Sequence, residues 1–237
     1  MKPVLLALQF MTRLPLPTIA AGEDDFGNAI RWFPIAGLIV GVAAAAAAWI
    51  GTLHSPALGA LLGLGAWVAI TGALHLDGLG DIADAAGAAH ADRSRISEVL
   101  ADPHIGSFGV TAIALQLLAK FVLLEALLQS GSAPLLVLAP VLARTGPMAW
   151  ALLLPALHSG FGTLFRQGAN WPVFGCWLAM WSGFAAVTCP LVLSAVAALP
   201  LWALWLNKRV GGISGDGHGA GIELVEVAAL LMLVLGQ

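Results

Sequence analysis

Two long stretches without a charged residue constrain the fold of this chain more than any other feature. They run from Trp32 to Leu76 and from Gln167 to Asn207. Each is long enough for two crossings, because a helix that spans the hydrocarbon core needs about 20 apolar residues. Of the 237 residues, 59% are hydrophobic and 10% are charged, which is too little polar surface for a water-soluble globule of this size. The chain is therefore predicted to be an integral membrane protein.

The predicted fold class is all-α, a polytopic membrane helix bundle in which residues 1–237 form one membrane-embedded catalytic domain. We expect about six or seven transmembrane helices. The candidate spans cover 33–53, 57–76, 106–129, 134–155, 173–189, 190–206 and 221–237. Pro190 divides the last long apolar run, and the sequence leaves open whether that run crosses once or twice. The short apolar stretch after Lys2 is predicted to be an interfacial or re-entrant piece.

Charge is distributed unevenly between the predicted connections. Nearly all of it lies in the amino-terminal segment and in 77–105, 156–172 and 207–220, whereas the turns 54–56, 130–133 and 188–190 carry none. An antiparallel arrangement places the charged segments on one face, and their excess of arginine and lysine assigns that face to the cytoplasm. We predict a multi-pass protein of the bacterial inner membrane with its polar chemistry facing the cytoplasm. The net charge of −3 gives no reason to expect nucleic acid as a partner.

Three aspartates follow the first charge-free stretch at helical spacing. Asp77, Asp81 and Asp84 are separated by four and three residues, so on a helix they fall within about 60° of one another. Anions this close repel one another, and a divalent cation would neutralise them. Carboxylate oxygens suit Mg²⁺, or Mn²⁺, better than Zn²⁺. We predict a metal site here; the alternative is a solvated helix end, where acids favour the N-terminus.

Two more polar segments have the composition of phosphate sites. Residues 92–109 contain Arg93 and Arg95, whose guanidinium groups suit phosphate oxygens, although a charged surface helix would look the same. Residues 211–226 are rich in glycine, and the backbone amides of such a loop can approach an anion closely. Its candidate residues are Gly215, Gly217 and Gly219, together with the acid Asp216. A simple turn is the alternative.

Lys120 and Arg144 lie near the middle of two consecutive predicted spans, at comparable depth. A stable bundle must direct both toward protein or water rather than lipid. Two cations near a group of acids could form a pocket for a polyanion. The alternative is that they pair with Glu125 or Glu223 for stability alone.

Together and in this order, these pieces resemble the cobalamin synthases, the adenosylcobinamide-GDP ribazoletransferases of the late vitamin B12 pathway. The resemblance covers most of the chain and rests on Thr12-Arg13-Leu14-Pro15, the run from His75 to Asp84, Arg95 with Asp102, Lys120, Arg144, Gly215-Asp216 and Glu223. The chain departs from the family at Pro103-His104, where the family usually has a small polar residue and often arginine, and at His218, where leucine is typical.

The resemblance implies an inner-membrane, Mg²⁺-dependent phosphotransferase. It would join adenosylcobinamide-GDP to α-ribazole, or to α-ribazole 5′-phosphate, and release GMP. Its metal would be held by Asp77, Asp81 and Asp84, and Asp84 and Asp216 are equal candidates for the catalytic base. The residues expected to bind substrate and phosphate are Arg13, Arg93, Arg95, Lys120, Arg144, Gly215, Gly217 and Gly219. Association with other late-pathway cobalamin enzymes is an expectation from the family alone.

Two other functions share parts of this pattern. A CDP-alcohol phosphatidyltransferase also sets aspartates along a membrane helix, but it typically has a second aspartate pair one turn apart and an Ala-Arg step after the first, whereas Asp81 here is followed by Ile-Ala-Asp. A cation transporter would need carboxylates along the middle of several spans, whereas the acids here gather at the predicted cytoplasmic ends.

Overall fold

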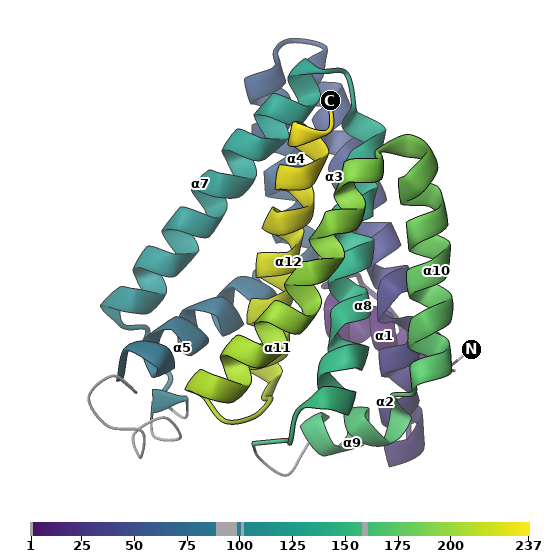
Figure 1. Cartoon of the computed structure of the whole chain (residues 1–237), viewed down its shortest axis with the longest axis vertical. Coiled ribbons are helices and arrows are strands. Elements are labelled where there is room, and N and C mark those ends of the chain that lie inside the picture. The colour runs from purple at the N-terminus through teal and green to yellow at the C-terminus, as the bar shows by residue number, and fades with distance from the viewer. Residues whose placement is uncertain (1, 89–98, 101, 158–160) are drawn as a thin grey trace.

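The computed structural model describes residues 2–88, 99–100, 102–157 and 161–237. Within these ranges the chain is almost wholly helical, and the one pair of β-bridged residues is Ala156 with Ile213. Figure 1 shows the helices packed as a single bundle, and the all-α prediction is confirmed. The described helices are, in chain order, α1 (Lys2–Met11), α2 (Glu23–Ala29), η1 (Ile30–Trp32), α3 (Phe33–Thr52), α4 (Pro56–Thr71), α5 (Leu74–Ala88), α7 (Ser107–Gln129), η3 (Ala133–Val137), α8 (Leu138–Leu153), α9 (Phe161–Gly168), α10 (Trp171–Thr188), η4 (Pro190–Ala197), α11 (Ala198–Arg209) and α12 (Gly215–Leu235).

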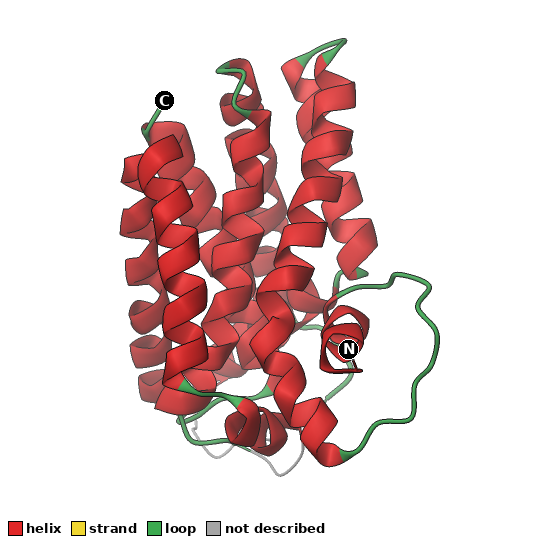
Figure 2. Ribbon diagram, turned by 90° about the vertical axis from the view of Figure 1, so that its right-hand side faces the viewer, coloured by secondary structure: helices red, strands yellow, loops and turns green. Residues whose placement is uncertain are grey.

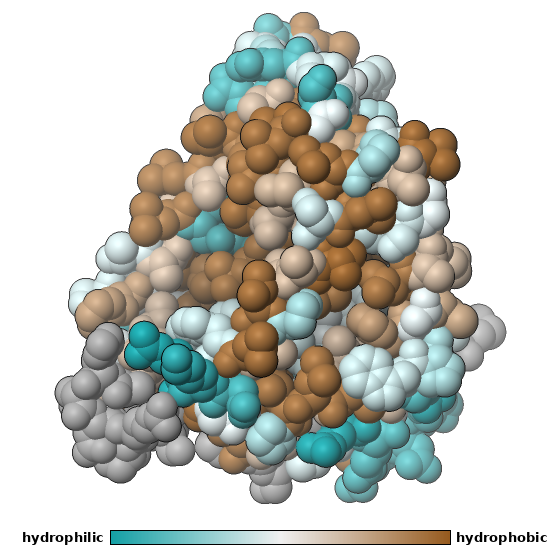
Figure 3. Space-filling model, viewed as in Figure 1, coloured by the Kyte–Doolittle hydropathy of each residue, from teal (hydrophilic) through white to brown (hydrophobic). Residues whose placement is uncertain are grey.

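Several of these helices can cross a membrane. Five described segments are long and apolar enough by length and composition, and the bent pair α4 and α5 would make six. The five are Glu23–Thr52, Ser107–Gln129, Ala133–Leu153, Pro190–Arg209 and Gly215–Leu235. Hydrophobic residues cover the middle of the face in Figure 3, and hydrophilic residues gather toward both ends. The polytopic membrane fold is confirmed. The described residues form five or six candidate spans, compared with the six or seven that were predicted.

The apolar run 173–206 forms two antiparallel arms. The first arm is α10, and the second is η4 continued by α11, which returns along the bundle (Figure 1). Pro190 is the first residue of the second arm, where its missing amide proton is tolerated. The arms therefore divide where the sequence placed the break.

The predicted span 57–76 is not one continuous helix in the structure. Helix α4 ends at Thr71, and the chain turns by 84° into α5. Gly72 and Ala73 both have positive φ, of 61° and 58°, and this left-handed backbone ends an α-helix. The Arg13 side chain packs against Gly72, and a Cβ at that position would collide with it. As a result α5 lies across the bundle rather than along it (Figure 1).

Two elements near the charged end of the bundle position the site. Helix α1 is seen end-on in Figure 2, where it lies across the long helices. Residues 12–22 form a loop that runs around one side of the bundle to α2. Leu6, Ala7 and Met11 of α1 are buried against the bundle. Helix α12 packs against α5, α7 and α8, so its N-terminal end lies next to α5.

Candidate active site

The three aspartates of α5 lie on one helix, as predicted, but their carboxylates do not share a partner. The Asp84 carboxylate accepts hydrogen bonds from the backbone amides of Gly106, at 2.7 Å, and Gly109, at 3.0 Å. These amides belong to the first turn of α7, whose orphan N–H groups and positive dipole end favour an anion. A Cβ at Gly106 or Gly109 would collide with this carboxylate. Asp84 therefore caps α7 from a neighbouring helix.

The structure does not gather Asp77, Asp81 and Asp84 around one ion. Among the described residues, no group of three or more histidine, cysteine, aspartate or glutamate side chains is arranged to hold a metal. The negative charges that act on Asp81 come from Asp216 first, then from Asp77 and Asp84. Of these three carboxylates, that of Asp216 therefore acts most strongly on Asp81. We call Asp77, Asp81 and Asp216 the acidic cluster.

A close contact between α5 and α12 brings Asp216 to this cluster. A Cβ at Gly78 would lie 2.9 Å from both the Cα and the carbonyl oxygen of Asp216, so the two backbones touch there. Helix α12 begins at Gly215, and Ser214 caps it by accepting a hydrogen bond from the Gly217 amide at 3.0 Å. Asp216 lies in the first turn, where the helix dipole stabilises its negative charge.

The glycine-rich segment is therefore a short non-helical stretch, 211–214, followed by helix from Gly215 onward; phosphate binding by its amides stays a prediction. Gly217 faces the side chains of Ile213 and Leu206, and a Cβ at Gly219 would lie 3.3 Å from the Cα of His75. These two glycines permit close packing. A Cβ at Gly215 would meet nothing within 4 Å, so this residue alone of the three retains open space.

A cavity of about 190 Å³ lies between the ends of α1, α3, α5, α9 and α12. Asp77 and Asp216 open into it from two helices, so two members of the acidic cluster face a space that a ligand can enter. The remaining lining residues are His75, His218, Gly215, Gly219, Phe10, Met11, Phe33, Leu74, Phe165 and Ile222. The cavity combines an acidic side with an aromatic and aliphatic side.

Two histidines lining the cavity were not predicted as site residues. His75 is 3% exposed and His218 is 5% exposed. The Nε2 atom of His75 and both ring nitrogens of His218 have no hydrogen-bond partner among the described residues. The sequence feature that could have identified them is their position, because each lies two residues from an aspartate of the acidic cluster. Spacing along the chain does not show which ring nitrogens lack partners.

Arg13 lies beside the cavity at the bend between α4 and α5. Its backbone amide donates to the Ile70 carbonyl at 2.7 Å, and its side chain packs against Gly72. Arg13 is exposed, and two residues before it Met11 lines the cavity. Arg93 and Arg95, the other predicted phosphate ligands of this face, lie outside the described residues.

Lys120 and Arg144 do not reach the cavity. Lys120 Nζ pairs with Glu223 at 2.6 Å and with Glu226, and Arg144 Nη1 pairs with Glu226 at 2.6 Å. All four side chains are 4% exposed or less. Two positive and two negative charges therefore balance inside the bundle. This matches the alternative in which the two cations pair with acids for stability. Of the two acids named there Glu223 is a partner and Glu125 is not, and Glu226 is a further partner. We call these four residues the ion-pair cluster.

Polar neighbours complete the ion-pair cluster. Gln116 Nε2 donates to the Glu223 carboxylate at 2.8 Å, and Trp67 Nε1 donates to Glu226 at 3.3 Å. The Lys120 ammonium lies 4.7 Å from the centre of the Trp67 ring, within the range of a cation–π contact. The cluster and its neighbours join α4, α7, α8 and α12, and a contact toward the cavity runs through His75, whose Nδ1 lies 3.4 Å from Arg144 Nη2.

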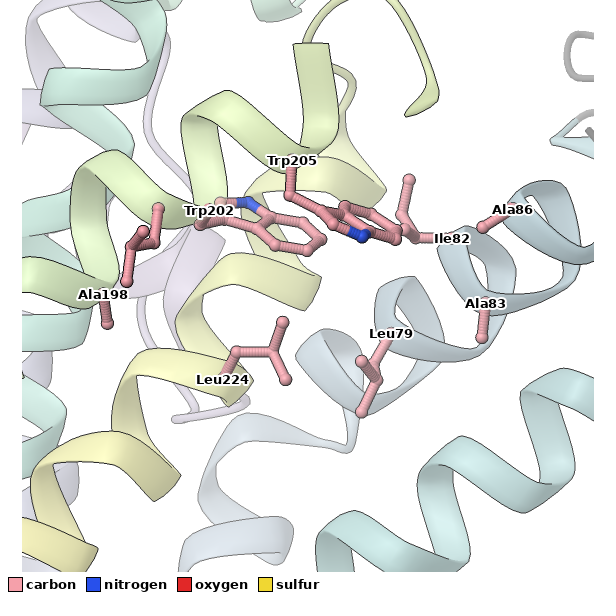
Figure 4. Close-up of a pocket in the computed structure, with 9 residues that line it drawn as sticks. Leu79, Ile82, Ala83, Ala86, Ala198, Trp202, Trp205 and Leu224 are labelled. Atoms are coloured by element: carbon pink, nitrogen blue, oxygen red, sulfur yellow. The ribbon is translucent and has the colours of Figure 1, made fainter. Parts of the chain in front are cut away.

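The opposite face of α5 borders a larger apolar groove of about 660 Å³. Figure 4 shows Leu79 and Ile82 of α5 facing Trp202 and Trp205 of α11, with Leu224 of α12 beside them. The two indole rings are stacked, with centroids 5.1 Å apart. The described residues that line this groove are all uncharged, so they are not suited to a phosphate group.

The fold and the site define a class of protein, a multi-pass helical membrane protein with an acidic cavity near one end of its bundle. The chain belongs to the cobalamin-5-phosphate synthase family, because the family model of that description matches residues 3–234.

Curated relatives resemble the chain over nearly its whole length. A protein of Novosphingobium aromaticivorans is 49% identical over 99% of this chain and 97% of its own length. One from Thiobacillus denitrificans is 49% identical over 98% and 94%, and one from Pseudomonas aeruginosa is 39% identical over 99% and 98%. All three are named adenosylcobinamide-GDP ribazoletransferase. No solved structure matches the chain.

Proposed function

We propose that this protein joins adenosylcobinamide-GDP to α-ribazole, or to α-ribazole 5′-phosphate, and releases GMP. The products are adenosylcobalamin or its 5′-phosphate. The observation that carries the proposal is the acidic cluster at a cavity with an aromatic side, in a chain whose relatives bear that enzyme name along their full length. Carboxylates and an aromatic wall are the groups that a reaction between a diphosphate and a nucleoside requires.

The reaction replaces the phosphoanhydride bond of the GDP group by a phosphodiester bond. A ribose hydroxyl attacks the phosphorus that bears the cobinamide arm, a new P–O bond forms, and the bond from that phosphorus to the bridging oxygen of GMP breaks. The hydroxyl proton must pass to a base, and GMP leaves with the bridging electrons. Catalysis of this kind depends on positioning and on stabilising the negative charge of the leaving group.

Asp216 is the better placed of the two candidate bases. Its side chain lines the cavity, where the hydroxyl of a bound nucleoside could reach it. Both oxygens of Asp84 instead accept hydrogen bonds from backbone amides of α7, and Asp84 is not among the described residues that line the cavity. We therefore assign proton removal to Asp216 and the positioning of α7 against α5 to Asp84.

Asp77 and Asp81 are the residues that we propose would hold Mg²⁺. They lie one turn apart on α5, and Mg²⁺ in phosphate-transfer sites is typically bound by one or two carboxylates and by substrate oxygens. Two carboxylates therefore suffice, which fits a structure in which Asp84 faces elsewhere. When bound, the ion would neutralise charge on the diphosphate. Mn²⁺ prefers the same oxygen ligands.

Cations near the cavity mouth would bind the departing GMP. Arg13 is exposed at the bend and is the described arginine that we assign to this role. Arg93 and Arg95 stay predictions for the same phosphate groups. Lys120 and Arg144 already have buried carboxylate partners, so we propose that they act on the site indirectly, by fixing α7, α8 and α12.

We propose that the site faces the cytoplasm of a bacterial cell, across the inner membrane. Basic residues mark the end of the bundle that carries the cavity, and the turns at the other end carry no charge; the basic residues are Lys2, Arg13, Arg31, Arg166, Lys208 and Arg209. The positive-inside rule places that end in the cytoplasm. A cysteine introduced at Arg209 should react with a membrane-impermeant thiol reagent only after the cells are opened, in a chain whose own cysteines are replaced.

One assay tests the reaction. Purified protein in liposomes should release GMP from adenosylcobinamide-GDP only when α-ribazole or its phosphate and Mg²⁺ are both present. Chelation should abolish release, and Mg²⁺ or Mn²⁺ should restore it. Release of CMP from a CDP-lipid would show the phosphatidyltransferase instead, and cation uptake into sealed vesicles without turnover would show the transporter. Either result would overturn the proposal.

A further inference from the structure

The apolar groove between α5 and α11 opens toward the surroundings of the bundle. Leu79, Ile82 and Trp202 form its buried part, whereas Trp205 and Leu224 are each 39% exposed. Figure 4 shows α5 and α11 presenting these side chains to the same space. Exposed apolar surface of this extent marks a place where another molecule packs. In a chain that spans a membrane, the surroundings of such a groove are hydrocarbon.

The groove is suited to hydrocarbon rather than to a polar ligand. Its described lining residues are leucine, isoleucine, alanine and tryptophan. The indole nitrogen of Trp202 already donates a hydrogen bond to the Gly217 carbonyl, at 3.0 Å. The rings of Trp202 and Trp205 are nearly parallel, with 17° between their planes, so they form one flat apolar wall. A chain of methylene groups gains dispersion energy along such a wall.

Two cations continue the same face of α11 beyond the groove. The residues of this helix that line the groove are Ala198, Leu201, Trp202 and Trp205. With 3.6 residues per turn, Arg209 lies about 30° from the middle of that stripe, and Lys208 lies about 70° from it. Both cations are exposed in the last turn of α11. Hydrophilic residues gather at this end of the helix in Figure 3.

The order of these groups along α11 matches the order of groups in a membrane lipid. The groove residues of α11 lie in the charge-free run that ends at Asn207, and the two cations follow it directly. Helix α11 runs along the bundle, with its last turn at the charged end of the molecule (Figure 1). Tryptophan is enriched just inside the headgroup level of a membrane. Arg209 lies about 6 Å along the axis beyond Trp205, where the phosphate of a lipid would be, and guanidinium binds phosphate oxygens well.

We propose that this groove is a binding site for one anionic phospholipid. An acyl chain of the lipid lies against Trp202 and Trp205, and its phosphate pairs with Arg209. Lys208 adds a second positive charge at the headgroup, so a lipid with a net negative charge is favoured over a zwitterionic lipid with the same chains. The site lies on the face of α5 opposite the acidic cluster and does not depend on the proposed function.

Lipids with brominated acyl chains test the site, because bromine quenches indole fluorescence only at close contact. The signal of Trp205 is the difference between the wild-type protein and Trp205→Phe, each in phosphatidylcholine liposomes with a rising fraction of brominated lipid. We expect half of the quenching at an at least fivefold lower fraction of brominated phosphatidylglycerol than of brominated phosphatidylcholine. The matched control is Trp171, an exposed indole of α10 near the same end of the bundle (Figure 1). Its signal, obtained in the same way with Trp171→Phe, should agree within twofold for the two lipids.

A second variant separates recognition of the headgroup from contact with the chain. One basic residue near an anionic membrane surface strengthens lipid binding roughly fivefold, so Arg209→Gln should lower the preference of Trp205 for phosphatidylglycerol by about that factor. Arg166→Gln is the matched control, since Arg166 is exposed in α9 at the same end of the bundle, and it should leave the preference within twofold of wild type. An unchanged preference in Arg209→Gln would overturn the proposal.

A measurement on the wild-type protein covers the case in which a variant fails to fold. Protein extracted in mild detergent from liposomes with equal amounts of the two lipids should retain phosphatidylglycerol at least fivefold over phosphatidylcholine. Equal retention, or equal quenching of Trp205 by both lipids, would show an unselective lipid shell and contradict the inference.

Another occupant of the groove would contradict it as well. Absence of Trp205 quenching by either lipid would exclude a lipid chain from the groove. A disulfide between two copies of the Leu201→Cys variant, in a chain whose own cysteines are replaced, would then place a second copy of the protein there. Relief of the quenching by adenosylcobinamide-GDP would instead assign the groove to that molecule.

Discussion

The ion-pair cluster and the acidic cluster are both groups of charged side chains on the helices around α12, and they differ in charge balance. The first sets two cations against two carboxylates, with 2.6 Å between Lys120 and Glu223 and between Arg144 and Glu226, and with almost no exposure. The second places Asp77 and Asp216 at one cavity, with Asp81 one turn further along α5, and α5 and α12 touch at Gly78. Charges that are buried for stability are neutralised by their neighbours, whereas like charges held together beside a cavity are suited to a ligand of opposite charge.

The comparison also separates two roles for the same residue types. Lys120 and Arg144 have the charge that phosphate binding requires, yet their partners leave them no free face. Asp84 has the same side chain as Asp81, yet two amides of α7 occupy it. The partner of each charge, and not its sign, decides its role.

Removing a charge from the acidic cluster should have the largest effect. Asp81→Asn is expected to lower kcat for GMP release by about 10³-fold, as when a major electrostatic contribution to a transition state is lost. The thermal unfolding temperature should not fall, since the substitution relieves repulsion between like charges. Activity within tenfold of wild type would show that the cluster is not the reaction centre.

Breaking the ion-pair cluster should instead reduce stability. Glu226→Met leaves Arg144 buried without its carboxylate and should cost about 3–5 kcal/mol of folding free energy. The measurement is reversible unfolding in mixed micelles.

The double variant Arg144→Met/Glu226→Met provides the control for that experiment. It leaves Lys120 paired with Glu223 and should recover most of the loss, because both members of one pair are gone. A double variant as unstable as the sum of the single ones would show that the four charges do not act as pairs.

The contact that assembles the acidic cluster can be loosened without changing a charge. Gly78→Ala places a Cβ 2.9 Å from the Asp216 backbone, so α5 and α12 must separate slightly. Misplacement of reacting groups by a fraction of an ångström should lower kcat by about tenfold. Gly65→Ala in α4 is the matched control, since its Cβ meets nothing within 4 Å, and it should leave kcat unchanged.

The smallest expected effect distinguishes Asp84 from its neighbours. Asp84→Asn should cost about 1 kcal/mol of stability through the weakened cap of α7 and should lower kcat less than tenfold. Thermal unfolding and GMP release measure the two quantities. A loss of activity equal to that of Asp81→Asn would return Asp84 to the predicted metal ligands.

The features that were correctly predicted are local ones. Apolar runs locate the membrane helices, Pro190 marks the division of the last long run, and helical spacing places three aspartates on one helix. The bend at Gly72 and Ala73 was missed, because nothing within 57–76 breaks the apolar pattern and the turn is completed by packing against Arg13. The glycines after Ser214 looked like a loop because glycine permits both open loops and close helix contacts.

The sequence by itself determined that this protein is a bundle of membrane helices with its charge at one end, since hydropathy and helical period are properties of neighbouring residues. Only the tertiary structure decided which charges meet. It turned Asp84 toward α7, brought Asp216 to Asp81, and paired Lys120 and Arg144 with α12. These partners are far apart in the chain, and the packing of separate helices brings them within a few ångströms, where electrostatic interactions are strong.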